Sequence, residues 1–233
     1  MQIVIICGGE GKRLGEISKN IPKGLIIINK KPFMEYLINS LIPFKPNNIH
    51  FCLGKFSEQY LEFLSTIKIG INYTYSIEDS KSLLGTGGAI KNSLSYLQNQ
   101  FIVQYGDTIL DLDYKELFDI HKNFKKDMTM TISSSKLTYE TPNLICKRNK
   151  DNLLDCVYDK KLYKNNGNYI DYGALVFNKK VFQADLPDKF DLSLVQSYLS
   201  KGGNAFFYEI KKRYIEIGTE YSLKNAKKIL KNV

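Results

Sequence analysis

Short hydrophobic runs rich in β-branched residues alternate with amphipathic segments of helical length through the first half of the chain. This alternation is typical of parallel βαβ units, because each helix returns the chain to the edge of the sheet where the next parallel strand begins. The pattern predicts strands at 3–7, 49–53, 71–76 and 101–105, and helices at 32–44, 57–66, 89–97 and 113–124. We therefore expect a mostly parallel sheet covered by helices.

The pattern changes after Lys126, where strand-like runs follow one another with only turns between them. These runs predict strands at 128–133, 143–148, 153–158 and 169–177, and the next helix is expected at 192–199. No proline-rich or serine-rich linker separates the two halves. The chain is therefore predicted to be one domain, 1–233, with a parallel lobe at 1–126 and an antiparallel addition at 127–233.

The composition is that of a globular protein with a sizeable core, since 43% of its 233 residues are hydrophobic. No uncharged apolar run approaches the ~18 to 20 residues that a membrane span needs, and the start of the chain lacks the pattern of a signal peptide. We expect a cytoplasmic protein with no membrane partner.

The net charge of +9 raises the question of a nucleic-acid partner. The lysines are scattered, however, and cluster only at 224–231. There they form the solvated face of a predicted amphipathic helix whose apolar side is Leu223, Ala226, Ile229 and Leu230. Nucleic-acid binding is therefore not expected.

The four cysteines, Cys7, Cys52, Cys146 and Cys156, form no Cys-x-x-Cys pair. Three of them lie in hydrophobic, strand-like runs, where cysteine behaves as a small hydrophobic residue. We expect reduced structural thiols rather than a disulfide or a zinc site.

A glycine-rich loop at 8–13 follows the first predicted strand. It is not a dinucleotide fingerprint, because the third glycine position holds Leu14, and it is not a P-loop, because Ile6 and Arg13 stand where that motif needs Gly and Ser or Thr. What remains is a flexible loop whose N–H groups and cations can surround a triphosphate. A plain surface turn is the alternative for this loop taken alone.

Three further stretches favour a phosphate site. Pro22-Lys23 adds a cation shortly after the loop, and proline fixes its approach. The glycine-rich turn at 84–89 precedes or opens a helix, allows close approach of a flat ligand and offers a helix N-terminus to an anion. Gly106-Asp107 follows a strand directly, so the carboxylate is expected at the carboxyl edge of the sheet, where open α/β folds bind ligands.

In this order and spacing, the stretches CGGEGKRL, PKG, LGTGGAI, YGDT, DYGALVF and EIGT resemble the sugar-1-phosphate nucleotidyltransferase family of nucleoside-diphosphate-sugar pyrophosphorylases. The resemblance covers the chain from Ile3 to about Leu230, and within the family it is greatest to short bacterial heptose-1-phosphate guanylyltransferases. It implies a Rossmann-like, three-layer α/β fold with a mixed, mostly parallel sheet. Residues 1–126 would form the nucleotide-binding lobe, and 127–233 the antiparallel, sugar-phosphate-binding lobe.

The implied reaction joins a nucleoside triphosphate to a sugar 1-phosphate and releases pyrophosphate. GTP with a heptose or hexose 1-phosphate is the expected substrate pair, in capsule or lipopolysaccharide synthesis, and a homodimer is one expected state. Two alternatives stay open: a cytidylyltransferase for a sugar phosphate or another small phosphorylated or phosphonylated acceptor, and an inactive nucleotide-binding relative. The sequence does not identify the nucleobase or the sugar.

The resemblance also implies roles for individual residues. Arg13 would bind the β- and γ-phosphates and Lys23 the α-phosphate side of the transition state, so these two are the predicted catalytic residues. The predicted nucleotide-binding residues are Cys7, Gly8, Gly9, Gly11, Lys12, Gly85, Thr86, Gly87, Gly88 and Asp107. Lys12 departs from the family, where Thr or Ser is usual, and its role stays open.

Mg²⁺ is the implied cofactor, held by Asp107 and Glu216. The family usually has an aspartate at the second position, so Glu216 changes the expected geometry. The implied sugar-phosphate ligands are Asp159, Lys160, Asp171 and Gly173. For Asp171, a strand carboxylate paired with a nearby lysine is the structural alternative.

Overall fold

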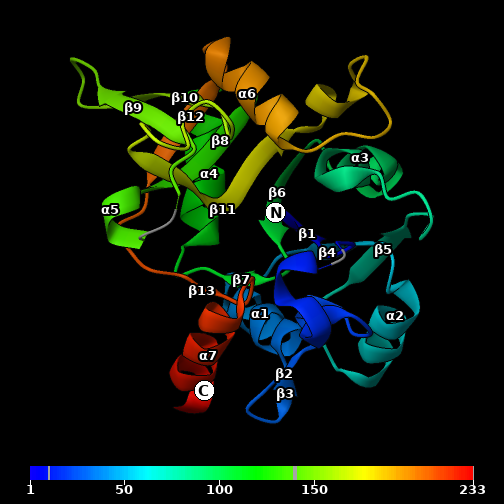
Figure 1. The fold of residues 1–233 in the computed structure, drawn as a ribbon. Helices are drawn as coiled ribbons and strands as arrows, with labels where there is room; N and C mark the ends of the chain where they lie inside the picture. The colour runs from blue at the N-terminus through cyan, green and yellow to red at the C-terminus, as the bar shows by residue number, and fades with distance from the viewer. Residues whose placement is uncertain (10, 139–140, 233) are drawn as a thin grey trace.

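The computed structural model describes residues 1–9, 11–138 and 141–232, and for Lys12 and Asn232 it describes the backbone alone. Its centre is a nine-stranded mixed sheet in which seven strands follow the order β10-β9-β11-β6-β1-β4-β5 (Figure 1). The central strand β1 (Gln2–Ile6) pairs in parallel with β4 (Asn48–Leu53) and β6 (Gln100–Tyr105), and β4 pairs in parallel with β5 (Tyr73–Ile77). The predicted parallel core is confirmed.

Helices cover both faces of this sheet and make the three layers of the predicted α/β fold. Residues of α1 (Phe33–Leu41), α2 (Ser57–Thr66) and α4 (Tyr114–Phe124) pack in one hydrophobic core. Residues of α3 (Gly85–Asn92) and α6 (Ser193–Lys201) pack in another. The side chains of β1 alternate between the two cores, which explains why this strand reads as an unbroken hydrophobic run.

The second half of the chain extends the same sheet, mostly with antiparallel pairs, as the sequence predicts. The long strand β11 (Tyr169–Asn178) pairs antiparallel with β6 and with β8 (Met128–Ser134). The hairpin of β9 (Leu144–Arg148) and β10 (Leu154–Tyr158) continues the sheet beyond β11. Strand β12 (Ala205–Glu209), which the sequence analysis does not predict, pairs in parallel with β8. The division of the domain at residue 126 stays a prediction.

Two short antiparallel ladders complete the strands. In the first, β7 (Thr108–Ile109) pairs with β13 (Ile215–Glu216), and α7 (Glu220–Ile229) follows directly, beside α1 in Figure 1. In the second, β2 (Ile27–Ile28) pairs with β3 (Lys31–Pro32). The remaining helical elements are the one-turn helix α5 (Ser135–Thr138) and 3₁₀ segments at Lys12–Ser18, Lys23–Leu25, Ile42–Phe44, Leu94–Tyr96, Lys179–Gln183 and Leu230–Asn232.

The expectation of four reduced cysteines is wrong for two of them, because Cys146 and Cys156 form a disulfide. The two residues lie opposite each other in the hairpin, with their Cα atoms 4.1 Å apart. The side-chain amide of Asn168 forms hydrogen bonds with the backbone N–H and the carbonyl of Cys146. The two cysteines are therefore a non-hydrogen-bonded cross-strand pair, the kind in which the side chains are nearest. Cys7 and Cys52 are free thiols, as expected.

Two smaller expectations also need correction. The helix predicted at 89–97 begins at Gly85 and ends at Asn92. Ile229 is 57% exposed and does not share the buried side of α7 with Leu223 and Ala226. None of the helices in the described part of the chain has the length and apolar character that crossing a membrane requires.

Candidate active site

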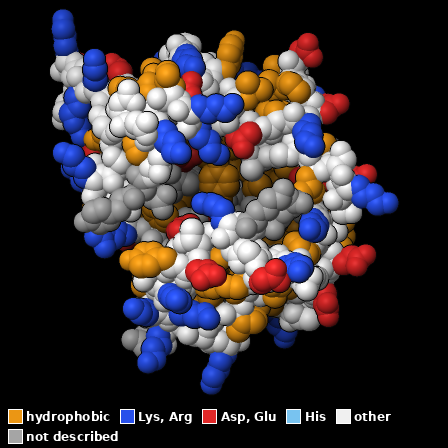
Figure 2. All heavy atoms as spheres, in the orientation of Figure 1, with side chains coloured by type: hydrophobic (Ala, Val, Ile, Leu, Met, Phe, Trp, Pro, Cys, Tyr) orange, Lys and Arg blue, Asp and Glu red, His pale blue; other side chains and the backbone are white. Residues whose placement is uncertain are grey.

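A cavity of about 150 Å³ lies at the carboxyl ends of β1 and β6. These strands are parallel and in register at Ile6 and Tyr105, so the loops that follow them leave the sheet at the same edge. Six predicted residues line this cavity: Cys7, Gly9, Gly11, Lys23, Thr86 and Asp107. The face shown in Figure 2 is hollowed at its centre, where basic and hydrophobic side chains meet.

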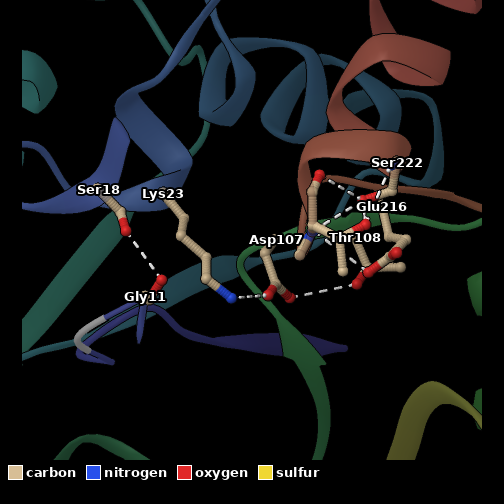
Figure 3. A network of polar contacts seen from close by, with 9 residues as sticks. Gly11, Ser18, Lys23, Asp107, Thr108, Glu216 and Ser222 are labelled. Carbon is tan, nitrogen blue, oxygen red and sulfur yellow. Dashed lines mark hydrogen bonds and ion pairs between the residues drawn. The ribbon is translucent and has the colours of Figure 1, made fainter. Parts of the chain in front are cut away.

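The first glycine loop packs tightly against Lys23. Gly11 has a left-handed backbone with φ of 72°, and its carbonyl accepts hydrogen bonds from the Leu14 amide at 3.0 Å and the Ser18 hydroxyl at 2.8 Å (Figure 3). A Cβ at this position would lie 3.1 Å from Cγ of Lys23 and 2.9 Å from Cβ of Ser18. Glycine is therefore required both by the conformation and by the space.

Lys23 and Asp107 form an ion pair at the wall of the cavity. The Lys23 ammonium group donates to Oδ2 of Asp107 at 3.0 Å, and the side chains are only 16% and 25% exposed (Figure 3). The other carboxylate oxygen, Oδ1, accepts from the Thr108 hydroxyl at 3.3 Å. Because water screens this pair less than a surface pair, its electrostatic attraction is stronger than that of an exposed salt bridge.

Glu216 reaches the same edge from the far end of the sequence. It lies opposite Thr108 in the ladder of β7 and β13, and its Oε2 accepts from the Gly218 amide at 3.3 Å. A Cβ at Gly218 would lie 2.6 Å from this oxygen and 3.2 Å from Nη2 of Arg13. The structure therefore brings Arg13, Lys23, Asp107 and Glu216 together. The side chain of Lys12 lies outside the described part of the chain.

Asp107 and Glu216 supply the donors that a magnesium ion prefers, since both are carboxylates: Asp107 directly precedes β7, and Glu216 lies in β13, which pairs with β7. Mg²⁺ is commonly held by one or two carboxylates together with phosphate oxygens and water. In residues 1–9, 11–138 and 141–232 no cluster of three or more His, Cys, Asp or Glu side chains is placed to hold a metal. The two residues therefore fit a metal whose remaining ligands come from a bound phosphate.

The second glycine turn is shaped by packing against the loop before α6. Gly87 and Gly88 both donate their amides to the carbonyl of Phe190, at 3.0 and 3.2 Å, so these two groups are not free for an anion as the sequence analysis expects. A Cβ at Gly87 would lie 2.2 Å from the Phe190 ring. Of this turn, Thr86 alone lines the cavity, and its hydroxyl accepts from the Leu192 amide at 2.8 Å.

Close packing also favours glycine at position 8, because a Cβ there would lie 3.1 Å from the backbone nitrogen of Gly54. Neither Gly8 nor Gly85 lines the cavity. Gly85 has φ of 78°, and a Cβ there would lie 2.6 Å from the carbonyl oxygen of Phe190. Nucleotide contacts by these two glycines stay predictions.

Asp171 lies at an irregularity of β11 where Gly173 has φ of 110°. Its Oδ1 accepts from the Gly173 amide at 2.9 Å, and its Oδ2 accepts from the Gln196 side chain at 2.7 Å. Burial raises the pKa of Asp171 to about 6, while Gln196 and the Lys160 charge act in the opposite direction. Asp171 is thus held firmly by hydrogen bonds from Gly173 and Gln196.

Asp159 and Lys160 are neighbours in the chain but differ in their contacts. Asp159 accepts from the amides of Lys161 and Leu162 and pairs with the Lys201 ammonium group at 3.0 Å, so its carboxylate orders a turn. Lys160 is exposed, and its charge acts to lower the pKa of both Asp171 and Asp191. The structure therefore brings Lys160 near Asp171, while Asp159 is already engaged by Lys201.

Two tyrosines that line the cavity are not among the residues predicted from the sequence. Tyr60 of α2 and Tyr105 of β6 line it. Burial and then the Asp171 charge raise the pKa of Tyr105, and Asp107 contributes in the same direction. Its place directly before Gly106-Asp107 is a signal from which it could have been found. No comparable signal marks Tyr60.

Comparison with known proteins agrees with this arrangement. The family model described as nucleotidyl transferase matches residues 2–232. A D-glycero-α-D-manno-heptose 1-phosphate guanylyltransferase of Aneurinibacillus thermoaerophilus is 30% identical over all of this chain and 99% of its own. The enzyme of the same name from Campylobacter jejuni is 40% identical over 50% of this chain and 52% of its own.

Solved structures show the same relationship. HddC from Yersinia pseudotuberculosis superposes with a TM-score of 0.77 at 26% identity, covering 98% of each chain, and has also been solved in complex with GMP-PN. A putative glucose-1-phosphate thymidylyltransferase from Bacillus anthracis, at 20% identity and a TM-score of 0.82, shares the fold over 100% of this chain and 96% of its own. The predicted resemblance is confirmed: the chain belongs to the nucleotidyl transferase family, among its sugar-1-phosphate nucleotidyltransferases.

Proposed function

We propose that this protein joins a nucleoside triphosphate to a sugar 1-phosphate, forming a nucleoside-diphosphate sugar and pyrophosphate. The observation that carries the proposal is the cavity at the carboxyl ends of β1 and β6, where Lys23 and Asp107 meet the first glycine loop. The glycine loop and Lys23, which are near each other in the sequence, and the distant Asp107 there bring a close-packed backbone, a cation and a carboxylate to one point. Such a site binds phosphates.

The protein itself has little covalent chemistry to perform in this reaction. A sugar-phosphate oxygen attacks the α-phosphorus, pyrophosphate leaves, and the site must hold two polyanions in line and stabilise the charge that develops. Lys23 lines the cavity, which supports its proposed role of binding the α-phosphate. Arg13, which is exposed beside Gly218, is placed to follow the β- and γ-phosphates as they leave.

Asp171 and Lys160 are the proposed contacts to the sugar phosphate. The carboxylate of Asp171 is fixed by Gly173 and Gln196, so it is prepared to accept hydrogen bonds from sugar hydroxyls. The exposed ammonium group of Lys160 is free to reach the sugar phosphate. Asp159 is proposed to act mainly by ordering the turn that carries Lys160.

We further propose that the reaction depends on Mg²⁺, with Asp107 and Glu216 as its protein ligands. When bound, the ion neutralises phosphate charge during the transfer. Lys23 lies beside Asp107 and Arg13 lies near Glu216, so each proposed metal ligand has a cation close to it.

GTP and a heptose 1-phosphate are the proposed substrate pair, because two relatives are named D-glycero-α-D-manno-heptose 1-phosphate guanylyltransferase. This pair would place the protein in surface-polysaccharide synthesis in the cytoplasm. The homodimer likewise stays a proposal.

A screen of pyrophosphate release tests the function. Four or five nucleoside triphosphates are each combined with a panel of sugar 1-phosphates, with Mg²⁺ present or chelated. We expect turnover with GTP and heptose 1-phosphate that stops on chelation. Turnover only with CTP and a different acceptor would favour the cytidylyltransferase alternative, and no turnover with any pair would favour an inactive relative.

A further inference from the structure

The carboxylates of the proposed metal site have cations beside them before any ligand binds. Lys23 donates to Oδ2 of Asp107 at 3.0 Å. On the other side, Oε2 of Glu216 and Nη2 of Arg13 would lie 2.6 and 3.2 Å from one Cβ built at Gly218. Two negative charges therefore lie near two positive charges in the free protein.

Asp107 is the more fully engaged of the two carboxylates. One oxygen accepts from Lys23 and the other from the Thr108 hydroxyl at 3.3 Å. The Lys23 side chain is 16% exposed, so solvent screens its charge only in part. A divalent cation approaching Asp107 would meet the ammonium charge at the same carboxylate, and the two cations would repel each other.

A bound nucleotide would offer the Lys23 side chain a second partner. Its side chain lines the same cavity as the first glycine loop, so a bound triphosphate would offer it oxygens that carry more negative charge than one carboxylate. The backbone at Lys23 is fixed by the 3₁₀ turn Lys23–Leu25, in which the Ile26 amide donates a hydrogen bond to the Lys23 carbonyl at 3.1 Å. The exchange therefore needs movement of the side chain alone.

We propose that Lys23 and a divalent cation compete for Asp107, so that the free protein binds the cation weakly until a nucleotide draws Lys23 onto its phosphates. Lys23 then has two successive partners, Asp107 in the free protein and phosphate in the complex. The consequence is an order of binding, in which the cation enters with the nucleotide or after it. The identity of the nucleotide rests on the proposed function, but the competition is a property of the free protein.

The test measures Mn²⁺ binding to the free protein by electron paramagnetic resonance, with no nucleotide or sugar present. Lys23→Met is expected to bind one Mn²⁺ at least about 10-fold more tightly than the wild type, because the competing charge is gone. Lys19→Met is the matched control: it makes the same change in net charge at a 65% exposed lysine that pairs with Glu16. Its affinity for Mn²⁺ should equal that of the wild type.

The double variant Lys23→Met/Asp107→Asn should lose the gain, which assigns the ion to Asp107. Equal Mn²⁺ affinity in the wild type and Lys23→Met would overturn the proposal, as would an equal gain in Lys19→Met. If Lys23→Met does not fold, Lys23→Gln removes the charge and keeps a hydrogen-bond donor. A chain inactive with every substrate pair would contradict the proposed function and leave this binding result valid.

Discussion

Glu216 lies directly opposite Thr108 in the two-residue ladder of β7 and β13, and Thr108 directly follows Asp107 in the chain. The backbone strengthens this arrangement, because the Ile217 amide donates to the Asp107 carbonyl at 3.1 Å. This hydrogen bond joins the last part of the chain to the segment that carries Asp107. A glutamate at this position can share a ligand with Asp107.

Glu216→Gln should raise the Mg²⁺ concentration needed for half-maximal turnover by about 10-fold, because the amide keeps the size of the side chain but not its charge. Measuring the initial rate against Mg²⁺ concentration checks this. Glu220→Gln, at an exposed residue in the first turn of α7, is the control. An unchanged Mg²⁺ dependence in Glu216→Gln would remove Glu216 from the metal site.

Lys23→Ala and Asp107→Ala should each lower kcat by about 10²-fold or more, because each removes charge that stabilises the transition state. Steady-state kinetics at saturating Mg²⁺ separate kcat from KM. Lys19→Ala should retain the wild-type rate. A near-native kcat in either site variant would exclude the role assigned to that residue.

Gly87→Ala should lower the free energy of unfolding by about 1 to 3 kcal/mol, because the added methyl group would overlap the Phe190 ring. Gly9→Ala is the matched control, since a Cβ there meets nothing within 4 Å. Urea unfolding followed by circular dichroism measures both. Equal stability of the two variants would show that α3 does not need Gly87 for its packing against Phe190.

The raised pKa of Asp171 predicts a loss of stability with rising pH. Its pKa is about 6 in the folded protein, so between about pH 4 and pH 6 the folded state keeps a proton that the unfolded chain has released. The contribution is fully present below the unfolded pKa and is lost as pH rises through the folded pKa. Relative to Asp171→Asn, the wild type should therefore lose roughly 2 kcal/mol of unfolding free energy across this window.

Parallel unfolding titrations of the wild type and Asp171→Asn at several pH values check this. The asparagine keeps the shape of the side chain, and the Gln196 amide can turn to pair with it. A difference in unfolding free energy that stays constant from pH 4 to pH 6 would contradict a raised pKa at Asp171.

The disulfide closes a loop with a sequence separation of 10, which in a chain-entropy model stabilises the fold by roughly 3 kcal/mol. Cys146→Ser/Cys156→Ser should be less stable than the wild type by about this amount in the absence of reductant, and the difference should shrink in its presence. Mass spectrometry after alkylation of the unreduced, denatured protein should find modified Cys7 and Cys52. Four alkylated cysteines would show that the bond does not form.

The parallel core was predictable because its central strands, such as β1, are buried on both faces and form continuous hydrophobic runs. Motifs that immediately follow such strands, including Cys7 and Asp107, were equally accessible, since the topology brings the carboxyl ends of parallel strands to one edge. The sequence thus led to six of the residues that line this cavity.

Other contacts depend on strand register and on packing between distant segments, and no local sequence pattern reveals either. The disulfide requires that Cys146 and Cys156 face each other across a hairpin, and a shift of one residue would separate them. The bond from Gln196 to Asp171 depends on where α6 packs against the sheet. The need for glycine at position 87 comes from the Phe190 ring, which lies far along the chain.

The central claim is nucleotidyl transfer to a sugar phosphate, and the most direct measurement is of its products. GTP and D-glycero-α-D-manno-heptose 1-phosphate are incubated with the protein and Mg²⁺, and products are quantified by ³¹P NMR. The account predicts one pyrophosphate for each GDP-heptose formed, with no free phosphate. Hydrolysis of GTP to GDP and phosphate, or the absence of any nucleoside-diphosphate sugar with every triphosphate and sugar 1-phosphate tested, would contradict it.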